Sequence, residues 1–298
     1  MSQPDAAPAG VIHDIGYRGY QGDRLGRSGI RFALFTHSLR GVFGLGRSGR
    51  SKVIPFGLVG VMLLPAVIIA AIVIIGGGVG PVSTPAYAQY AGQLTAATWI
   101  FVAVQAPQAV SLDMRFGTLP LYMSRPLTRG DYVVAKIAAL TGGVFLLIAT
   151  PILILYLGAV FAELPLGENS AAAGWAILGA VLYSAMFSGI GLLIASLTSR
   201  RGFGIAAIIT VLALSYVIVS SMQGAIGHGM GEERLAGWLG LFSPNTLLDG
   251  VQVWAFDAGS SSVLPVPDGA GPVFLLVTLL VIGGSYAALA ARYRKVRL

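Results

Sequence analysis

Six apolar stretches, each about as long as a helix that crosses a membrane, divide most of this 298-residue chain. A bilayer core takes about 20 mostly apolar residues as helix, because each backbone amide there must be paired within its own segment. Only 10% of the residues are charged, against about 25% in soluble domains, and 55% are hydrophobic. The sequence therefore predicts an all-α integral membrane protein with six transmembrane helices, at residues 54–75, 94–112, 132–161, 173–197, 203–221 and 272–291.

The basic residues gather on one side of this predicted topology. Lys and Arg beside short loops stay in the cytoplasm. With six spans, eighteen of the nineteen cations fall on the side that holds both termini, and Arg234 alone falls opposite, together with seven acids. We therefore expect cytoplasmic N- and C-termini. Sixteen Arg against three Lys, with abundant Ala and Gly, is typical of a GC-rich bacterium, so we expect a multi-pass protein of the bacterial plasma (inner) membrane.

The segment before the first span predicts an amphipathic helix. From residue 30 to 43, Phe32, Phe35 and Leu39 share one arc, whereas His37 and Arg40 lie on another. Such a helix lies flat on the inner leaflet, where its aromatic side chains and arginines hold it. The alternative is a disordered basic tail. We expect a disordered cytoplasmic tail at 1–28, an elbow helix and linker at 29–53, a six-span domain at 54–291 and a basic cytoplasmic tail at 292–298.

The connection at 113–136 between the second and third predicted spans is longer than a minimal link requires. It carries a short apolar knob, residues 119–123, within a basic frame. Pro120 and Pro126 bracket this knob and limit any helix to a turn or two. The pattern predicts a rigid cytoplasmic projection that a partner surface receives. An interfacial helix packed on lipid headgroups is the alternative, and composition does not separate the two.

The only long external segment, 222–271, predicts two short amphipathic helices. The first has apolar residues at 235, 238, 239 and 242, and the second starts with Ser243 as N-cap and Pro244 at its first position. Both are too short to span a membrane. We expect them to roof the outer mouth of the bundle and to form an external gate with Trp238, Phe242, Leu247 and Trp254.

The motifs that carry hydrolytic chemistry or bind a metal are missing from the sequence. No Lys follows a Gly, so no Walker A loop exists, and the GxGxxG at 44–49 has no preceding strand and predicts a hinge instead. Three dispersed His and no Cys make no metal motif. We expect a non-catalytic chain that binds no metal or cofactor.

The predicted spans carry no ionisable residue near their middles, although proton- and voltage-driven machines place such groups there. Their few polar residues are candidates for a substrate pathway. Small and hydroxylated residues in spans more often pack helices closely, and that is the alternative role. The candidate pathway residues are Gln105, Gln108, Ser184 and Ser188.

The chain after residue 28 resembles the membrane (permease) subunit of type-2 ATP-binding-cassette exporters. The resemblance is carried by Gly117-Thr118-Leu119-Pro120, by Ser124-Arg125-Pro126-Leu127-Thr128-Arg129 and, outside, by Ser243-Pro244 with Leu248-Asp249-Gly250. It implies an elbow helix, six spans, a cytoplasmic coupling helix between spans 2 and 3, and short external helices before span 6. It also implies ATPase-coupling residues, which are Leu119, Leu121, Tyr122, Met123, Arg125, Pro126 and Arg129.

The resemblance further implies the partners. These are two copies of an ATP-binding subunit, which uses ATP and Mg, and a second permease chain that is identical or paralogous; membrane lipid is a partner and nucleic acid is not. Two other classes of function stay open, a secondary transporter or channel and a non-transporting membrane scaffold or sensor. A secondary carrier stays active in ATP-depleted vesicles, and a scaffold purifies without an ATPase.

Overall fold

The structure, a computed structural model, describes residues 22, 26–77, 87–124, 126–198, 200–256, 260–264 and 266–295, and every regular element in these ranges is helical. The prediction of an all-α protein is therefore confirmed. A π-helical segment, η1 (Gly224–Gly229), follows α8, and a 3-10 segment, η2 (Leu239–Phe242), follows α9. The helices are α1 (Arg27–Val42), α2 (Arg50–Ile75), α3 (Tyr87–Gln93), α4 (Thr95–Arg115), α5 (Leu119–Met123), α6 (Arg129–Phe161), α7 (Leu166–Leu197), α8 (Arg201–Gln223), α9 (Glu233–Trp238), α10 (Pro244–Phe256) and α11 (Gly271–Lys295).

Five helices of the described ranges are long and apolar enough to cross a membrane. They are α2, α6, α7, α8 with its continuation to Gly229, and α11. These five contain the predicted spans at 54–75, 132–161, 173–197, 203–221 and 272–291. The sixth predicted span, 94–112, lies within α4, which is not among the five. A multi-pass membrane protein is thus supported, with five such helices where six were expected.

The position of α4 explains its weaker apolar character. Thirteen of its twenty-one residues are buried, whereas only five of the twenty-six residues of α2 are. It packs against α7 and α8 along much of its length, and also against α6. A helix enclosed by protein has no need of a lipid-compatible surface, so it tolerates polar residues such as Thr98 and Gln105, both of which are buried.

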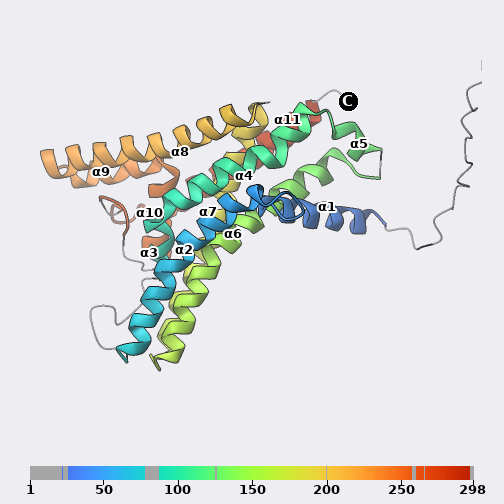
Figure 1. The fold of residues 1–298 in the computed structure, drawn as a ribbon. Helices are drawn as coiled ribbons and strands as arrows, with labels where there is room; N and C mark the ends of the chain where they lie inside the picture. Colours follow the sequence, from blue (N-terminus) through green and yellow to red (C-terminus); the bar gives the residue numbers. More distant parts are fainter. Residues whose placement is uncertain are drawn as a thin grey trace, which may run out of the picture.

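The helices spread from one common end of the molecule. In Figure 1, α1, α5 and the C-terminal end of α11 meet at the right, α2 and α6 run together toward the lower left, and α8 runs toward the upper left. The most extensive contacts join α6 to α7 and α2 to α6. We call the end where α1, α5 and the end of α11 meet the basic end, because Arg27, Arg31, Arg129, Arg292 and Arg294 lie there.

Small residues bring the central helices into direct contact. A Cβ atom placed on Gly158 of α6 would lie 2.9 Å from Cα of Ala70 in α2, and one on Gly189 of α7 would lie 2.8 Å from Cε1 of Tyr286 in α11. Both distances are below ordinary van der Waals contact. Glycine at these positions therefore lets α2 and α11 approach the central pair of helices closely.

A turn joins α1 to α2. Gly44 and Gly46 have φ angles of 68° and 83°, which residues with a side chain rarely adopt. A Cβ on Gly44 would also lie 2.8 Å from the backbone carbonyl carbon of Ser51. The glycines predicted to form a hinge thus make a tight turn, which places Gly44 next to Ser51 in the first turn of α2.

Candidate functional site

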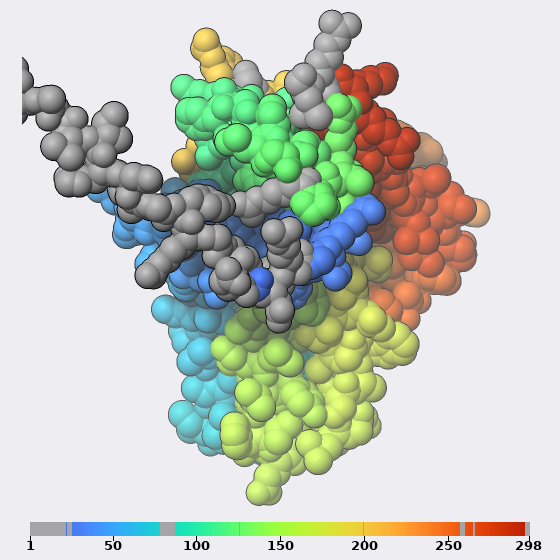
Figure 2. All heavy atoms as spheres, turned by 90° about the vertical axis from the view of Figure 1, so that its right-hand side faces the viewer, coloured from blue at the N-terminus to red at the C-terminus, as the bar shows by residue number. Residues whose placement is uncertain are grey.

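The basic end is tied together by contacts between residues far apart in the sequence. Arg129 Nη1 donates to the carbonyl oxygen of Arg294 at 2.6 Å, which joins the start of α6 to the end of α11. Arg292 Nε donates to the carbonyl of Ser196 at 2.8 Å, at the end of α7, where unpaired carbonyls attract cations. Figure 2 looks onto this end and shows α1, the region of α5 and the end of α11 side by side.

The short helix α5 rests on a buried ion pair. Lys136 Nζ of α6 lies 2.8 Å from Asp113 Oδ2 of α4, and their side chains are 8% and 16% exposed. The same carboxylate oxygen accepts a 2.7 Å hydrogen bond from Tyr132 Oη, and its other oxygen accepts from Thr118 Oγ1 at 3.3 Å. The end of α4, the start of α6 and the residue before α5 therefore share one carboxylate.

Aromatic rings complete this base. The ring of Tyr132 lies 5.6 Å from that of Tyr122 and 5.4 Å from that of Tyr293, between ring centroids. The Lys136 ammonium lies 5.3 Å from the Tyr132 centroid and 6.0 Å from that of Tyr122, within the range of cation–π attraction. Tyr122 therefore faces the body of the protein and fixes α5 to it.

The residues predicted to couple to an ATPase fall into two groups. Leu119 is buried and Tyr122 and Met123 are partly buried against the core, whereas Leu121 is 70% exposed and Pro126 is exposed. Arg129 is engaged with the end of α11. Arg125 lies outside the described residues. The structure thus presents Leu121 as the apolar side chain of α5 that is open to a partner, and the contact with an ATPase stays a prediction.

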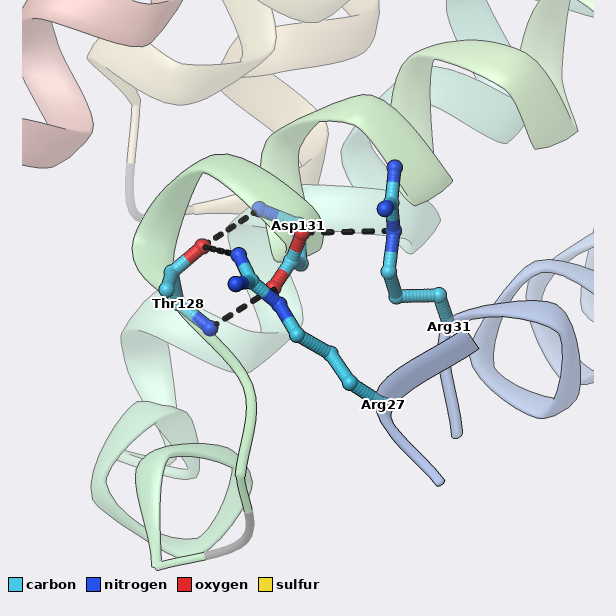
Figure 3. A network of polar contacts seen from close by, with 4 residues as sticks. All are labelled: Arg27, Arg31, Thr128 and Asp131. Atoms are coloured by element: carbon cyan, nitrogen blue, oxygen red, sulfur yellow. Dashed lines mark hydrogen bonds and ion pairs between the residues drawn. The ribbon is translucent and has the colours of Figure 1, made fainter. Parts of the chain in front are cut away.

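Two arginines of α1 converge on one carboxylate of α6, as Figure 3 shows. Arg27 Nε lies 2.9 Å from Asp131 Oδ2, and Arg31 Nε lies 3.2 Å from Asp131 Oδ1. The hydrogen bond with Asp131 raises the pKa of Arg27 above its ordinary value. Because both arginine side chains are about half exposed, each ion pair alone is weak, but the two act on the same carboxylate.

Asp131 also closes the start of α6. Thr128 Oγ1 accepts from the Asp131 N–H at 3.2 Å, and Asp131 Oδ2 accepts from the Thr128 N–H at 3.0 Å. This reciprocal pair is a capping box, which satisfies two backbone donors at the helix start. Arg27 Nη2 adds a 3.2 Å bond to Thr128 Oγ1. One four-residue network therefore starts α6 and holds α1 against it.

The predicted substrate-pathway residues do not gather in one cavity. Ser184 and Ser188 are buried in α7, and Ser184 Oγ donates to the carbonyl of Val181 at 2.9 Å. Ser188 Oγ lies 2.6 Å from Thr141 Oγ1 of α6, and Tyr286 Oη of α11 donates to the carbonyl of Ala185 at 2.8 Å. These hydroxyls join three helices, which favours the packing role.

Gln105 and Gln108 behave differently from the serines. Gln105 is 1% exposed, and neither its amide nitrogen nor its amide oxygen has a partner within the described part of the chain. Gln108 Oε1 accepts from Arg47 Nη1 at 2.6 Å. Both line a cavity of about 90 Å³ between α1, α4 and α6, together with Asp113 and Lys136. A polar cavity of this size has room for water, which suits the unpartnered Gln105 amide.

Two short helices, α9 and α10, lie where the external helices were predicted, but the predicted gate residues do not form one cluster. Leu247 is 1% exposed, whereas Phe242 is 75% exposed. Trp238 lies 6.4 Å from Phe274 between ring centroids, and Trp254 packs on Gly271. These contacts attach both tryptophans to the start of α11, and a gating role stays a prediction.

The prediction that Ser243 caps the second external helix is wrong in its mechanism. The helix α10 begins at Pro244 as expected, but Ser243 Oγ has no hydrogen-bond partner among the described residues. Instead, Thr246 Oγ1 donates to the carbonyl oxygens of Gly240 and Ser243, at 2.7 and 3.1 Å. A side chain within α10, that of Thr246, therefore stabilises the turn that precedes this helix.

Asp249 of α10 has a role that the sequence analysis missed. Its carboxylate accepts from the hydroxyls of Ser260 and Ser261 and from the N–H groups of Ser261 and Ser262, at 2.5 to 3.2 Å. The sequence signal for this contact was a run of three serines that begins eleven residues after the acid. Likewise, Asp113 and Lys136, of opposite charge at the two ends of one link, were the signal for the ion pair beneath α5.

Compared with known proteins, the chain matches no protein-family model and no curated protein. The function must therefore be argued from the arrangement of the described residues.

Proposed function

We propose that this chain is the membrane subunit of an ATP-driven exporter of the type-2 ATP-binding-cassette class. It forms the substrate pathway as a dimer with a second copy or a paralogue, and it couples to two separate ATP-binding subunits. The ATP-binding subunits use ATP and Mg, and this chain takes part in no chemical step. It resides in the bacterial plasma membrane with both termini in the cytoplasm.

One observation carries this proposal, the short helix α5 on its buried base. Asp113, Lys136 and Tyr132 fix α5 to α4 and α6, while Leu121 projects with 70% of its surface exposed. A helix that transmits motion from a partner must be attached rigidly to the protein and must expose a side chain to that partner, and α5 meets both requirements. We assign α5 as the coupling helix and α1 as the elbow helix.

In this proposal α4 also crosses the membrane, as the second span along the chain, and brings the number of spans to six. Its 21 residues extend about 32 Å at 1.5 Å per residue, which matches a hydrocarbon core of about 30 Å. Its enclosure by α6, α7 and α8 removes the need for a fully apolar surface. Six spans place α1, the α5 link, the α7–α8 turn and the end of α11 on one side, in agreement with the excess of cations there.

Isolation of the tagged chain from its native membranes tests the proposal. We expect an ATP-binding subunit to co-purify and to hydrolyse ATP in the complex, with vanadate-sensitive activity. The variant Leu121→Glu should lower both the recovery of that subunit and the ATPase activity per permease. Leu235→Glu, at an exposed leucine of α9, is the matched control and should change neither.

Absence of an ATP-binding subunit from the native isolate, or equal recovery with Leu121→Glu, would contradict the proposal. Orientation is tested separately, since the chain has no cysteine. A single Leu121→Cys variant should react with a membrane-impermeant maleimide only in inside-out vesicles. Labelling from outside the cell would show that α5 faces the wrong side for an ATPase.

A further inference from the structure

A second, larger pocket lies beside the cavity that contains Gln105. Its volume is about 460 Å³, and it is lined by Arg47 of the α1–α2 turn, by Arg50 at the start of α2 and by Arg201 at the start of α8. Arg47 and Gln108, which share a hydrogen bond, line both spaces. We call this pocket the arginine pocket. The α1–α2 turn, the starts of α2 and α8, and α4 form its walls.

The charge of the arginine pocket is uncompensated. No acidic residue lines it, and none of its three arginines forms an ion pair with an acid in the part of the chain that the structure describes. The three arginines are exposed to solvent, and an anion in the pocket would meet three positive charges and no negative one. Planar guanidinium groups match the geometry of phosphate and carboxylate oxygens.

Two helix starts add to the positive potential. Arg50 and Arg201 are the first residues of α2 and α8, and neither helix has an acid in its first turn or a side-chain cap. In the first turn of α2 the N–H groups of Ser51 and Lys52 already donate to the carbonyls of Ser48 and Gly49. The dipole at each helix start still favours an anion. A Cβ on Gly204 would lie 3.1 Å from Cγ of Pro107, so the start of α8 is held firmly against α4.

The remaining walls indicate where the anion comes from. Ile54, Pro55 and Val104 give the arginine pocket an apolar side. A free phosphate ion gains nothing from that surface, whereas the glycerol and first methylene groups of a lipid do. Because α2 and α8 are long and apolar enough to span the membrane, their first residues lie at the level of the headgroups. Basic pockets between spans on this side of a membrane are suited to anionic headgroups.

We propose that the arginine pocket binds the phosphate headgroup of an anionic phospholipid from the adjacent leaflet. Arg47, Arg50 and Arg201 hold the phosphate, and Ile54, Pro55 and Val104 contact the glycerol end of the lipid. This site is independent of any ATP-binding subunit. It concerns lipid bound to the permease chain, so its test and the test of the proposed function can fail separately.

Native mass spectrometry of the purified full-length chain, in detergent and without an ATPase, tests the site. We expect phosphatidylglycerol to stay bound at concentrations at which phosphatidylcholine does not. In the variant Arg50→Gln/Arg201→Gln the apparent Kd for phosphatidylglycerol should rise about 30-fold, which corresponds to about 2 kcal/mol at about 1 kcal/mol per arginine. The control Arg115→Gln/Arg234→Gln removes the same charge outside the pocket and should change the Kd less than about twofold.

Three results would overturn the site. The first is equal retention of the two lipids, and the second is equal loss of binding in the pocket and control variants. The third is displacement of phosphatidylglycerol by millimolar inorganic phosphate or pyrophosphate, which would identify a free phosphate as the ligand. If the double variant does not fold, the single variant Arg201→Gln must still weaken phosphatidylglycerol binding at least about fivefold.

Discussion

Lys136 and Asp113 stand at opposite ends of the link that carries α5 and meet at 2.8 Å beneath it. The pair closes a loop of the chain. If the end of α4 and the start of α6 separated, both charges would lose their partner. Tyr132 and Thr118 donate to the same carboxylate. The position of α5 therefore depends on this pair as well as on the packing of its own residues.

The first prediction concerns this pair. Lys136→Met leaves Asp113 without its cation in a largely buried position, which should lower the free energy of unfolding by about 3 kcal/mol. The double variant Asp113→Asn/Lys136→Met removes both charges and should recover most of that loss. Thermal unfolding in detergent measures both variants. Lys295→Met, at an exposed lysine, is the control, and a melting curve of Lys136→Met that equals the control would refute the prediction.

The second prediction concerns the attachment of α1. Asp131→Ala removes both ion pairs with α1 and half of the capping box, so α1 should detach from α6 more often. Trypsin should then cleave after Arg31 and Arg40 several-fold faster, as read by mass spectrometry. Glu168→Ala removes an acid from the first turn of α7 in the same way and should not alter cleavage in α1. Unchanged cleavage in Asp131→Ala would show that other contacts hold α1.

The third prediction concerns the segment that follows α10. Asp249→Ala deprives Ser260, Ser261 and Ser262 of their common acceptor. Amide hydrogen exchange of Ser261 and Ser262 should accelerate about tenfold or more, because each lost bond to a charged acceptor contributes about 1.5 kcal/mol or more. Asp268→Ala, at an exposed acid nearby, serves as the comparison. Protection that survives in Asp249→Ala would mean that the carboxylate does not order this segment.

The fourth prediction compares two glycine-to-alanine variants, which should change the free energy of unfolding in opposite directions. Gly158→Ala places a methyl group within 2.9 Å of Cα of Ala70, which should destabilise the protein by about 1 to 3 kcal/mol. Gly283→Ala meets no atom within 4 Å, so the better helix propensity of alanine should stabilise α11 by up to about 1 kcal/mol. Unfolding in denaturant measures both. A stabilising Gly158→Ala would disprove the close packing of α2 on α6.

Local signals in the sequence predicted the elements well. Pro120 and Pro126 restricted the link to a short helix, which is α5, and Pro244 marked the start of α10. Long apolar runs located the five span-length helices, although the predicted span at 173–197 starts after the helix does, at Leu166, and the one at 203–221 ends before the helix does, at Gly229. These features depend on the backbone preferences of neighbouring residues, so the sequence contains them directly.

The contacts between distant residues could not be predicted in the same way. Arg27 and Asp131 are 104 positions apart, and nothing in either neighbourhood specifies the other. The inward orientation of Tyr122 also followed from its neighbours in space, Tyr132 and Lys136, and not from the apolar pattern of the link. The span at 94–112 was predicted from its apolar run, and the apolar character of α4 is weaker than that of the other spans because helices surround it on several sides.

The bond between Arg129 and the carbonyl of Arg294 has a consequence for biogenesis. The two residues are 165 positions apart, so Arg294 is synthesised well after Arg129. Because synthesis proceeds from the N-terminus, α6 can settle against α1 and α7 early, but this bond forms only after α11 has been made and inserted. A nascent chain that stalls before α11 would therefore hold α5 on an unfinished base, and quality-control proteases would meet it in that state.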